Sequence, residues 1–193
     1  DRSADFDDEW VANGTNTNSI DSYFLTYANN SDIQFSTLKL FPGENIEDAY
    51  ADIGSLQNGY SIQQAFLGYW SGILDPENLD DDTNDDETNY ISNVASGNFN
   101  QNYLYASNGY NGKLAFNFAA DYDDKLFFGI NLNSHFINYE KFTRLRETNT
   151  NSGSVVNNIG FENLLLTTGS GFSFQLGTIA KITNDFRVGL SYN

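Results

Sequence analysis

Residues 110–122 read YNGKLAFNFAADY, in which large apolar side chains occupy every second position. Leu114, Phe116 and Phe118 fall on even numbers, whereas Lys113 and Asn117 fall on odd numbers. Because successive side chains of a β-strand point to opposite faces, this alternation predicts a strand with one apolar and one polar face. The alternation recurs in residues 125–135, 172–182 and 186–192, and turns are predicted at 123–124 and 183–185. The second half therefore predicts antiparallel hairpins.

A membrane barrel and a soluble sandwich both fit this alternation, because the strands of each have one apolar and one polar face. Three features favour the barrel. The predicted turns are short, whereas the connection from about Arg146 to Glu162 is long and polar, as in barrels with short periplasmic turns and long outer loops. Aromatic residues gather near the predicted strand ends, and the polar face is rich in Asn and small residues. We expect an all-β transmembrane antiparallel β-barrel, present as a partial chain, with a secreted β-sandwich binding module as the alternative.

The polar face of such a wall is expected to line a lumen. The residues concerned are Asn117, Asn131, Asn133, His135 and Gln175. The alternation changes phase between Ser134 and Tyr139, where either a bulge restores the register or the strand has left the membrane.

The distribution of charge divides the chain in two. Residues 1–108 hold 19 acidic and two basic residues, whereas residues 109–193 hold seven of each. This asymmetry predicts an external, acidic, partly helical loop region at 1–108 and membrane-spanning hairpins of the barrel wall at 109–193. The formal net charge of -17 argues against nucleic acid as a partner, because the two would repel each other. The sequence has no Met and lacks a leader pattern, so we expect an internal piece of a longer protein.

Helical spacing of apolar residues predicts three short amphipathic helices in the first region. The first follows Ser19, a candidate N-cap, the second covers 46–53, and the third runs from Ser61 to about Leu74. Residues 75–87, DPENLDDDTNDDE, have almost nothing to bury and are expected to form an exposed, mobile tip.

Aromatic side chains on these helices are the candidate ligand site. A groove that captures an acyl chain needs only apolar surface, worth about 0.8 kcal/mol per buried CH2. The alternative is that the same rings form the core of the external segment. The residues are Tyr23, Phe24, Tyr27, Phe66, Tyr69 and Trp70.

We expect no catalytic activity, no metal site and no cofactor. The sequence has no Cys, one His and no phosphate-binding Gly loop, so few catalytic groups are present. Residues with side-chain oxygens at alternate positions resemble a calcium loop, namely Asp80, Asp82, Asn84 and Asp86. Asp85 and Ile91 break the full pattern, which leaves a solvated tip as the default. His135 alone does not provide a bis-imidazole haem site.

Lys141, Arg144 and Arg146 form the one basic cluster. At the outer rim of a barrel they could bind lipopolysaccharide phosphates or a fatty-acid carboxylate. The alternative is a solvated loop base that pairs with Glu140 and Glu147.

The sequence resembles a known family in YNGKLAFNFAADYDDKLFFGINLNSHFINYEKFTR from Tyr110 and in GSGFSFQLGTIAKITNDFRVGLSYN from Gly169. The upstream segments LKLFPGENIEDAY and YSIQQAFLGYWSGI are similar to external-loop sequence of the same family. The family is the FadL and TodX type of outer-membrane transporter for long-chain fatty acids and other hydrophobic compounds. The resemblance implies a closed barrel with an N-terminal plug. It also implies an apolar external groove that captures the cargo, and lateral release of the cargo through the barrel wall.

The function expected from this resemblance is passive uptake of hydrophobic small molecules, such as long-chain fatty acids, across the outer membrane of a Gram-negative bacterium. The expected partners are outer-membrane lipid, lipopolysaccharide and the cargo itself. The alternative is a barrel subunit that serves as an interaction partner for other outer-membrane proteins, because a fold does not fix its function.

Overall fold

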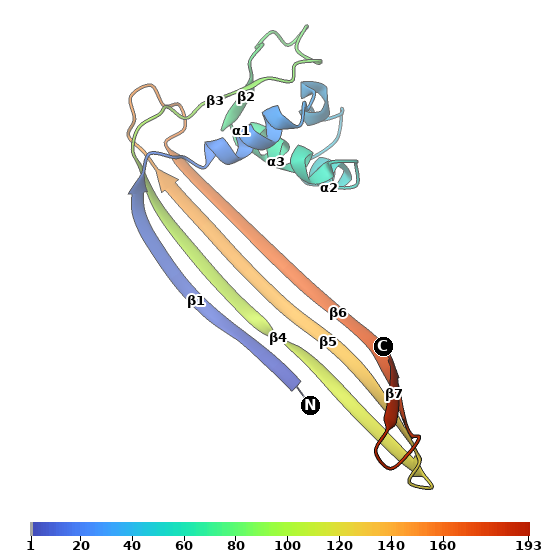
Figure 1. The fold of residues 1–193 in the computed structure, drawn as a ribbon. Helices are drawn as coiled ribbons and strands as arrows, with labels where there is room; N and C mark the ends of the chain where they lie inside the picture. The colour runs from blue at the N-terminus through green and yellow to red at the C-terminus, as the bar shows by residue number, and fades with distance from the viewer. Residues whose placement is uncertain (1) are drawn as a thin grey trace. The chain divides into compact units, whose positions relative to one another are not determined.

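The protein is described by a computed structural model that covers residues 2–193 (Figure 1). Strands hold 51% of the residues and helices 18%, so the predicted all-β class is confirmed. In chain order the elements are β1 (Arg2–Asn16), α1 (Asp21–Asn30), the 3-10 helix η1 (Phe35–Leu38), α2 (Ile46–Ile53), α3 (Gly59–Trp70), β2 (Leu74–Pro76), β3 (Tyr90–Ser92), β4 (Phe99–Tyr122), β5 (Leu126–Thr148), β6 (Asn158–Lys181) and β7 (Arg187–Tyr192).

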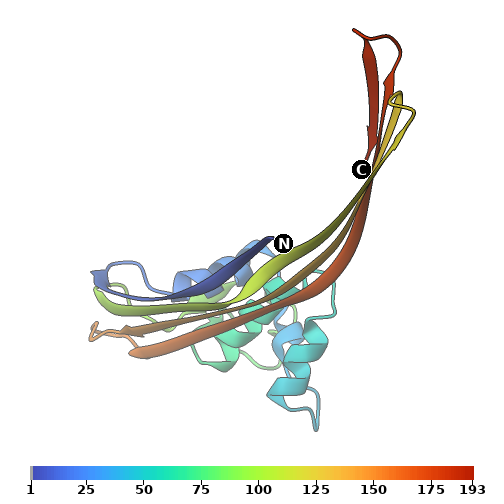
Figure 2. The ribbon, with the colours of Figure 1, turned by 90° about the horizontal axis from the view of Figure 1, so that it is seen from below.

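Five strands form one sheet in the order β1-β4-β5-β6-β7, and β2 pairs with β3 in a second, two-stranded sheet. The long strands β4, β5 and β6 run side by side in both ribbon views (Figure 2). Among the described residues the large sheet is open, with β1 and β7 at its two edges, and it does not close into a barrel. What is confirmed is an antiparallel hairpin array.

Both predicted turns are confirmed. Asp123 and Asp124 have φ angles of 56° and 52°, and the Lys125 N–H donates to the Tyr122 carbonyl over 3.1 Å. Short Asp and Asn side chains tolerate this left-handed backbone, which tight hairpin turns require. The second turn closes where the Ile182 N–H donates to the Phe186 carbonyl over 3.0 Å.

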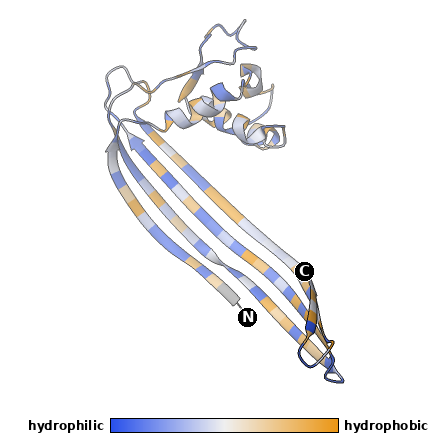
Figure 3. Cartoon of the chain, viewed as in Figure 1, coloured by the Kyte–Doolittle hydropathy of each residue, from blue (hydrophilic) through white to orange (hydrophobic). Residues whose placement is uncertain are grey.

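The strands alternate as predicted, and Figure 3 shows hydrophilic and hydrophobic residues following one another along them. Within residues 104–144 and 162–192 of β4 to β7, we call the even-numbered positions the apolar face and the odd-numbered positions the polar face. The register of β6 and β7 keeps the faces together, because Thr178 lies opposite Leu190 and Gly177 opposite Ser191. Apolar side chains on the apolar face stay exposed, as at Phe116, which is 59% exposed.

Three expectations about the strands need correction. Residues 2–16 form β1, although no strand was predicted in the first region. β4 already begins at Phe99, ahead of the predicted division at 108/109. β5 runs to Thr148 and β6 starts at Asn158, so the connection between them is shorter than the predicted segment from Arg146 to Glu162.

The expected change of phase in β5 has a different origin. β5 runs without a break through Ser134 and Tyr139, and Phe136 stays on the apolar face, where its ring lies 6.0 Å from that of Tyr110. Tyr139 stays on the polar face, where its hydroxyl lies 3.3 Å from that of Tyr105. The period of two therefore continues, and what changes is that aromatic side chains occupy the polar face.

The chain divides into two compact units, which we describe separately. The strand unit holds residues 2–11, Leu104–Arg144 and Glu162–Asn193, and the helical unit holds Ala12–Tyr103 and Leu145–Phe161. None of the four points at which the chain passes between the units coincides with residue 108. No helix among residues 2–193 combines the length and the apolar content needed to cross a membrane.

The helical unit has its own apolar core. Phe24 and Ala28 from α1, Ala65 and Phe66 from α3, and Phe99 from β4 are all buried there. Gly68 allows α1 and β2 to approach α3, because a Cβ added at this residue would lie 2.9 Å from side-chain atoms of Phe24 and Leu74.

The three predicted helices are present; α2 has the predicted bounds, whereas α1 and α3 differ from the expectation at their ends. The cap of α1 is Ile20 rather than Ser19, and α2 begins behind Asn45, whose side chain accepts from the Asp48 N–H over 2.9 Å. α3 covers Gly59–Trp70 instead of Ser61 to about Leu74. It ends early because Gly72 takes a positive φ of 75°, which stops the helix and leads the chain into β2.

Candidate ligand-binding surfaces

Neighbouring strands bring predicted lumen residues together on the polar face of the strand unit. The Asn131 side-chain amide on β5 donates to the Gln175 carbonyl oxygen Oε1 on β6 over 2.9 Å. Asn133 donates to the Ser173 hydroxyl over 3.3 Å, and His135 Nε2 lies 2.9 Å from the same hydroxyl. Asn133 is only 1% exposed, and its Oδ1 has no hydrogen-bond partner in the described chain. Asn117 is exposed on β4 and takes no part in this row.

A cluster of four aromatic rings on the same face was missed by the sequence analysis. The Trp10 and Tyr105 rings are stacked with centroids 5.4 Å apart, and the Phe6 and Tyr139 rings meet edge to face at 5.3 Å. The two tyrosine hydroxyls connect these pairs. Phe6 and Trp10 belong to β1, so the cluster could be recognised only once that strand was known to pair with β4.

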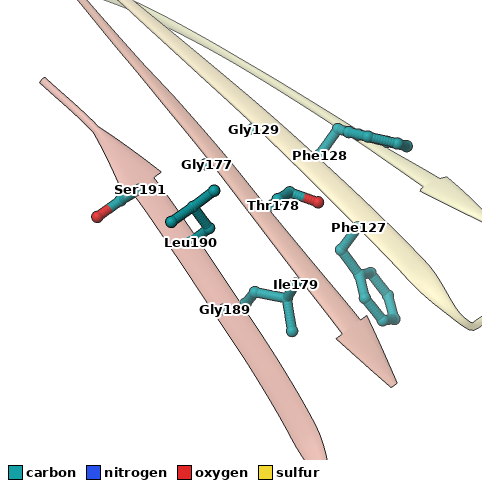
Figure 4. A pocket seen from close by; sticks show the side chains of 9 residues that line it. All are labelled: Phe127, Phe128, Gly129, Gly177, Thr178, Ile179, Gly189, Leu190 and Ser191. Atoms are coloured by element: carbon teal, nitrogen blue, oxygen red, sulfur yellow. The ribbon is translucent and has the colours of Figure 1, made fainter. Parts of the chain in front are cut away.

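The apolar face of the strand unit carries a shallow depression across β5, β6 and β7. It encloses about 520 Å³ and is lined by Phe128, Gly129, Ile130, Leu176, Gly177, Thr178, Leu190 and Tyr192. A neighbouring depression of about 470 Å³ overlaps it, and Figure 4 shows how Gly129, Gly177 and Gly189 leave the sheet bare between larger side chains. These surfaces fit a flexible apolar chain, which needs area rather than directed bonds.

The six predicted groove residues do not share one surface. Phe24 and Phe66 are 2% and 0% exposed and belong to the core of the helical unit, so they do not line an open groove. Tyr23 and Tyr69 are half-buried against that core, and Trp70 donates its indole N–H to the Leu38 carbonyl over 2.8 Å. Phe24 and Phe66 therefore agree with the alternative expectation, in which these rings form the core of the external segment.

Tyrosine side chains from α1 and α3 instead form a polar aromatic surface. The Tyr23 hydroxyl lies 3.0 Å from that of Tyr60 and donates to Gln64 over 3.1 Å, and the Tyr27 ring lies 5.5 Å from that of Tyr60. Burial, followed by the hydrogen bond with Tyr60, raises the pKa of Tyr23. Tyr23 therefore stays protonated at neutral pH and can donate to Gln64.

A buried carboxylate joins strands to helices within the helical unit. Glu147 on β5 is fully buried and accepts hydrogen bonds from the Ser19 hydroxyl, from the Ile20 N–H over 3.1 Å and from the Gln101 amide over 2.6 Å. Ser19 and Ile20 lead into α1, and Gln101 lies on β4. Glu147 therefore fixes the point at which α1 leaves the strands. The alternative expectation for Lys141, Arg144 and Arg146 is an ion pair with Glu147, and the structure shows no such pair among the residues that it describes.

The acidic segment 75–87 makes more contacts with the rest of the helical unit than is expected of an exposed, mobile tip. Asn84 is buried, where its carbonyl oxygen accepts from Lys39 Nζ over 2.9 Å. Lys39 also pairs with Asp85 at 2.7 Å, and the Phe35 N–H donates to the Glu87 carbonyl over 2.8 Å. The segment is thus attached to η1. Within residues 2–193, no group of His, Cys, Asp and Glu has the arrangement of a metal site.

In a scan of protein-family models, and in searches of curated proteins and of solved structures, nothing matches this chain. The likeness to the FadL and TodX family therefore rests on the quoted residues alone.

Proposed function

We propose that this chain forms part of the wall and the external segment of an outer-membrane β-barrel that takes up hydrophobic small molecules passively. Long-chain fatty acids are the model cargo. The observation that carries the proposal is the apolar face, on which large side chains of four neighbouring strands are exposed at alternate positions. Contiguous apolar surface of this kind marks an interface with a membrane or another protein.

The length of the apolar stretch supports a lipid contact. Along β4 it runs from Tyr110 to Tyr122, which at roughly 3.3 Å per residue is about 40 Å of strand. A strand tilted by about 45° would rise about 28 Å over that length, close to the apolar band of roughly 25 Å on barrel proteins. Tyr110 and Tyr122 then fall where aromatic girdles are found.

The polar face supports a lumen through which cargo passes. Its row of amides and hydroxyls at Asn131, Asn133 and Ser173 is compatible with water, whereas the rings of Phe6 and Trp10 offer exposed apolar surface beside it. Rings on an otherwise polar wall suit a cargo with an apolar body, because they supply area without a fixed hydrogen-bond geometry.

A second function is favoured by the surface of the helical unit. Phe41 is 75% exposed there, and Leu56 and Tyr60 are also exposed. Exposed aromatic and aliphatic side chains on a folded unit are typical of protein interfaces. In this alternative the barrel anchors the helical unit for an outer-membrane protein partner.

The first experiment extracts the intact protein from its membrane and compares its gel migration with and without boiling. The proposal expects extraction to require detergent and boiling to change the migration, since barrels resist unfolding by detergent alone. The extracted protein is then reconstituted in vesicles and tested for entry of a fluorescent long-chain fatty acid. Solubility without detergent overturns the membrane assignment. A heat-modifiable protein that admits no fatty acid, yet retains a protein partner on its helical unit, supports the second function instead.

A further inference from the structure

A polar depression lies across β1, β4 and β5 within the helical unit and has no role in the proposed transport. It encloses about 450 Å³ and is lined by Asn13, Gly14, Thr15, Asn100, Gln101, Asn102, Arg146 and Thr148. We call it the Arg146 depression. The space beside Gly14 is open, because no atom lies within 4 Å of where a Cβ on this residue would be.

The lining is rich in unused hydrogen-bond donors. The Thr15 hydroxyl donates to the Asn100 carbonyl oxygen over 3.1 Å, and the Asn102 amide donates to the Asn13 carbonyl oxygen over 2.6 Å. These bonds fix the acceptor ends of Asn100 and Asn13. The NH2 groups of both side chains have no partner among the described residues and remain as donors.

Arg146 is the only charged residue in the lining. It is exposed and forms no ion pair among residues 2–193, and the neighbouring carboxylate of Glu147 is already occupied by Ser19, Ile20 and Gln101. The Arg146 guanidinium can bind two oxygens of one phosphate, and the surrounding amide groups can bind hydroxyls. The lining is therefore complementary to a phosphate carried by a sugar.

We propose that the Arg146 depression binds the phosphorylated sugar headgroup of an outer-leaflet glycolipid. The inference rests on the proposed outer-membrane placement and identifies a lipid site on that wall. The phosphate of such a headgroup would bind the Arg146 guanidinium, and its sugar hydroxyls would bind the NH2 groups of Asn13 and Asn100.

The test measures binding of fluorescent lipopolysaccharide to the intact detergent-solubilised protein, using untreated and phosphatase-treated lipopolysaccharide. Arg146→Gln is expected to weaken binding of the phosphorylated form roughly tenfold, as for loss of one charge-assisted contact. Arg146→Gln should also remove the preference for the phosphorylated form. Arg146→Lys keeps the positive charge but cannot bind two phosphate oxygens in the planar geometry of a guanidinium, so it should retain part of that preference.

Arg187→Gln is the matched control, because Arg187 is an exposed arginine on β7 outside the depression. It should bind lipopolysaccharide as the unaltered protein does. Equal weakening by Arg146→Gln and Arg187→Gln, or a phosphate preference that survives Arg146→Gln, overturns the proposal. Boiling-dependent migration and fatty-acid entry, measured on the same samples, report separately on the barrel and its transport.

Discussion

At the scale of single residues, Glu147 illustrates how a buried charge can be held without a cation. Three donors converge on it from the start of α1 and from β4. Glu147→Ala would leave these donors buried or force them to find water, and an unsatisfied buried donor costs about 1–3 kcal/mol. We expect the free energy of local opening of α1 to fall by about 2–4 kcal/mol. Amide hydrogen exchange of Phe24 and its neighbours in the intact protein measures this opening.

Glu140→Ala provides the comparison for that measurement. Glu140 lies on the same strand, is exposed and has no ion-pair partner in the described chain. Its loss should leave exchange in α1 unchanged. Equal protection of α1 in the two variants would mean that Glu147 does not hold the start of the helix.

Glu87 connects the acidic segment to pH. The N–H of Asn89 donates to its carboxylate over 2.8 Å, and this bond, with those from the Asn89 side chain and the Thr88 N–H, lowers the pKa of Glu87 below its usual 4.5. A lowered folded pKa contributes stability that is complete above the unfolded value and is lost as the pH falls through the folded value. We expect the free energy of unfolding of Glu87→Gln to depend less on pH below about 4.5 than that of the unaltered protein. Carboxyl-carbon titration by NMR checks the pKa directly, and a midpoint at or above 4.5 would contradict the assignment.

At the scale of elements, Gly109 permits the close approach of β4 and β5. It has a φ of 143°, and a Cβ there would lie 2.2 Å from the Asn138 carbonyl oxygen, which is backbone and cannot rotate away. Overpacking of this kind costs about 1–3 kcal/mol. We expect Gly109→Ala to lower the unfolding temperature, whereas Gly160→Ala on β6, with nothing within 4 Å of its Cβ, should leave it unchanged. Equal unfolding temperatures would show that β4 moves aside without cost.

The hairpins could be predicted from sequence because their signals are local. A repeat of two and turn residues such as Asp123 and Asp124 fix strand and connection within a few positions. β1 carries no such signal, since Asp8 and Gly14 interrupt the apolar set to which Phe6 and Trp10 belong. Its strand structure depends on pairing with β4, and such pairing lies outside what a single segment encodes.

At the scale of the molecule, the sequence predicted faces better than it predicted sites. The odd positions of β5 and β6 bring Asn131, Asn133 and Gln175 into one row, because parity alone assigns the face. For Phe24 and Phe66 the helical spacing identified an apolar side but could not say whether another element covers it, and both lie in the core. The depression around Arg146 also escaped prediction, because its residues come from three strands far apart in the sequence.

Adjacent residues of β4 test whether the apolar face meets lipid. Phe116 and Asn117 are both exposed and point to opposite faces of one strand, so the same substitution probes two surroundings. An arginine near the middle of a membrane costs about 2–4 kcal/mol, whereas in a wet lumen it costs little. We expect Phe116→Arg to lower the free energy of unfolding by that amount, measured by urea titration of the vesicle-bound protein, and Asn117→Arg to leave it nearly unchanged. Equal tolerance at the two positions would mean that the apolar face does not meet hydrocarbon, and a protein or a second sheet would then have to cover it.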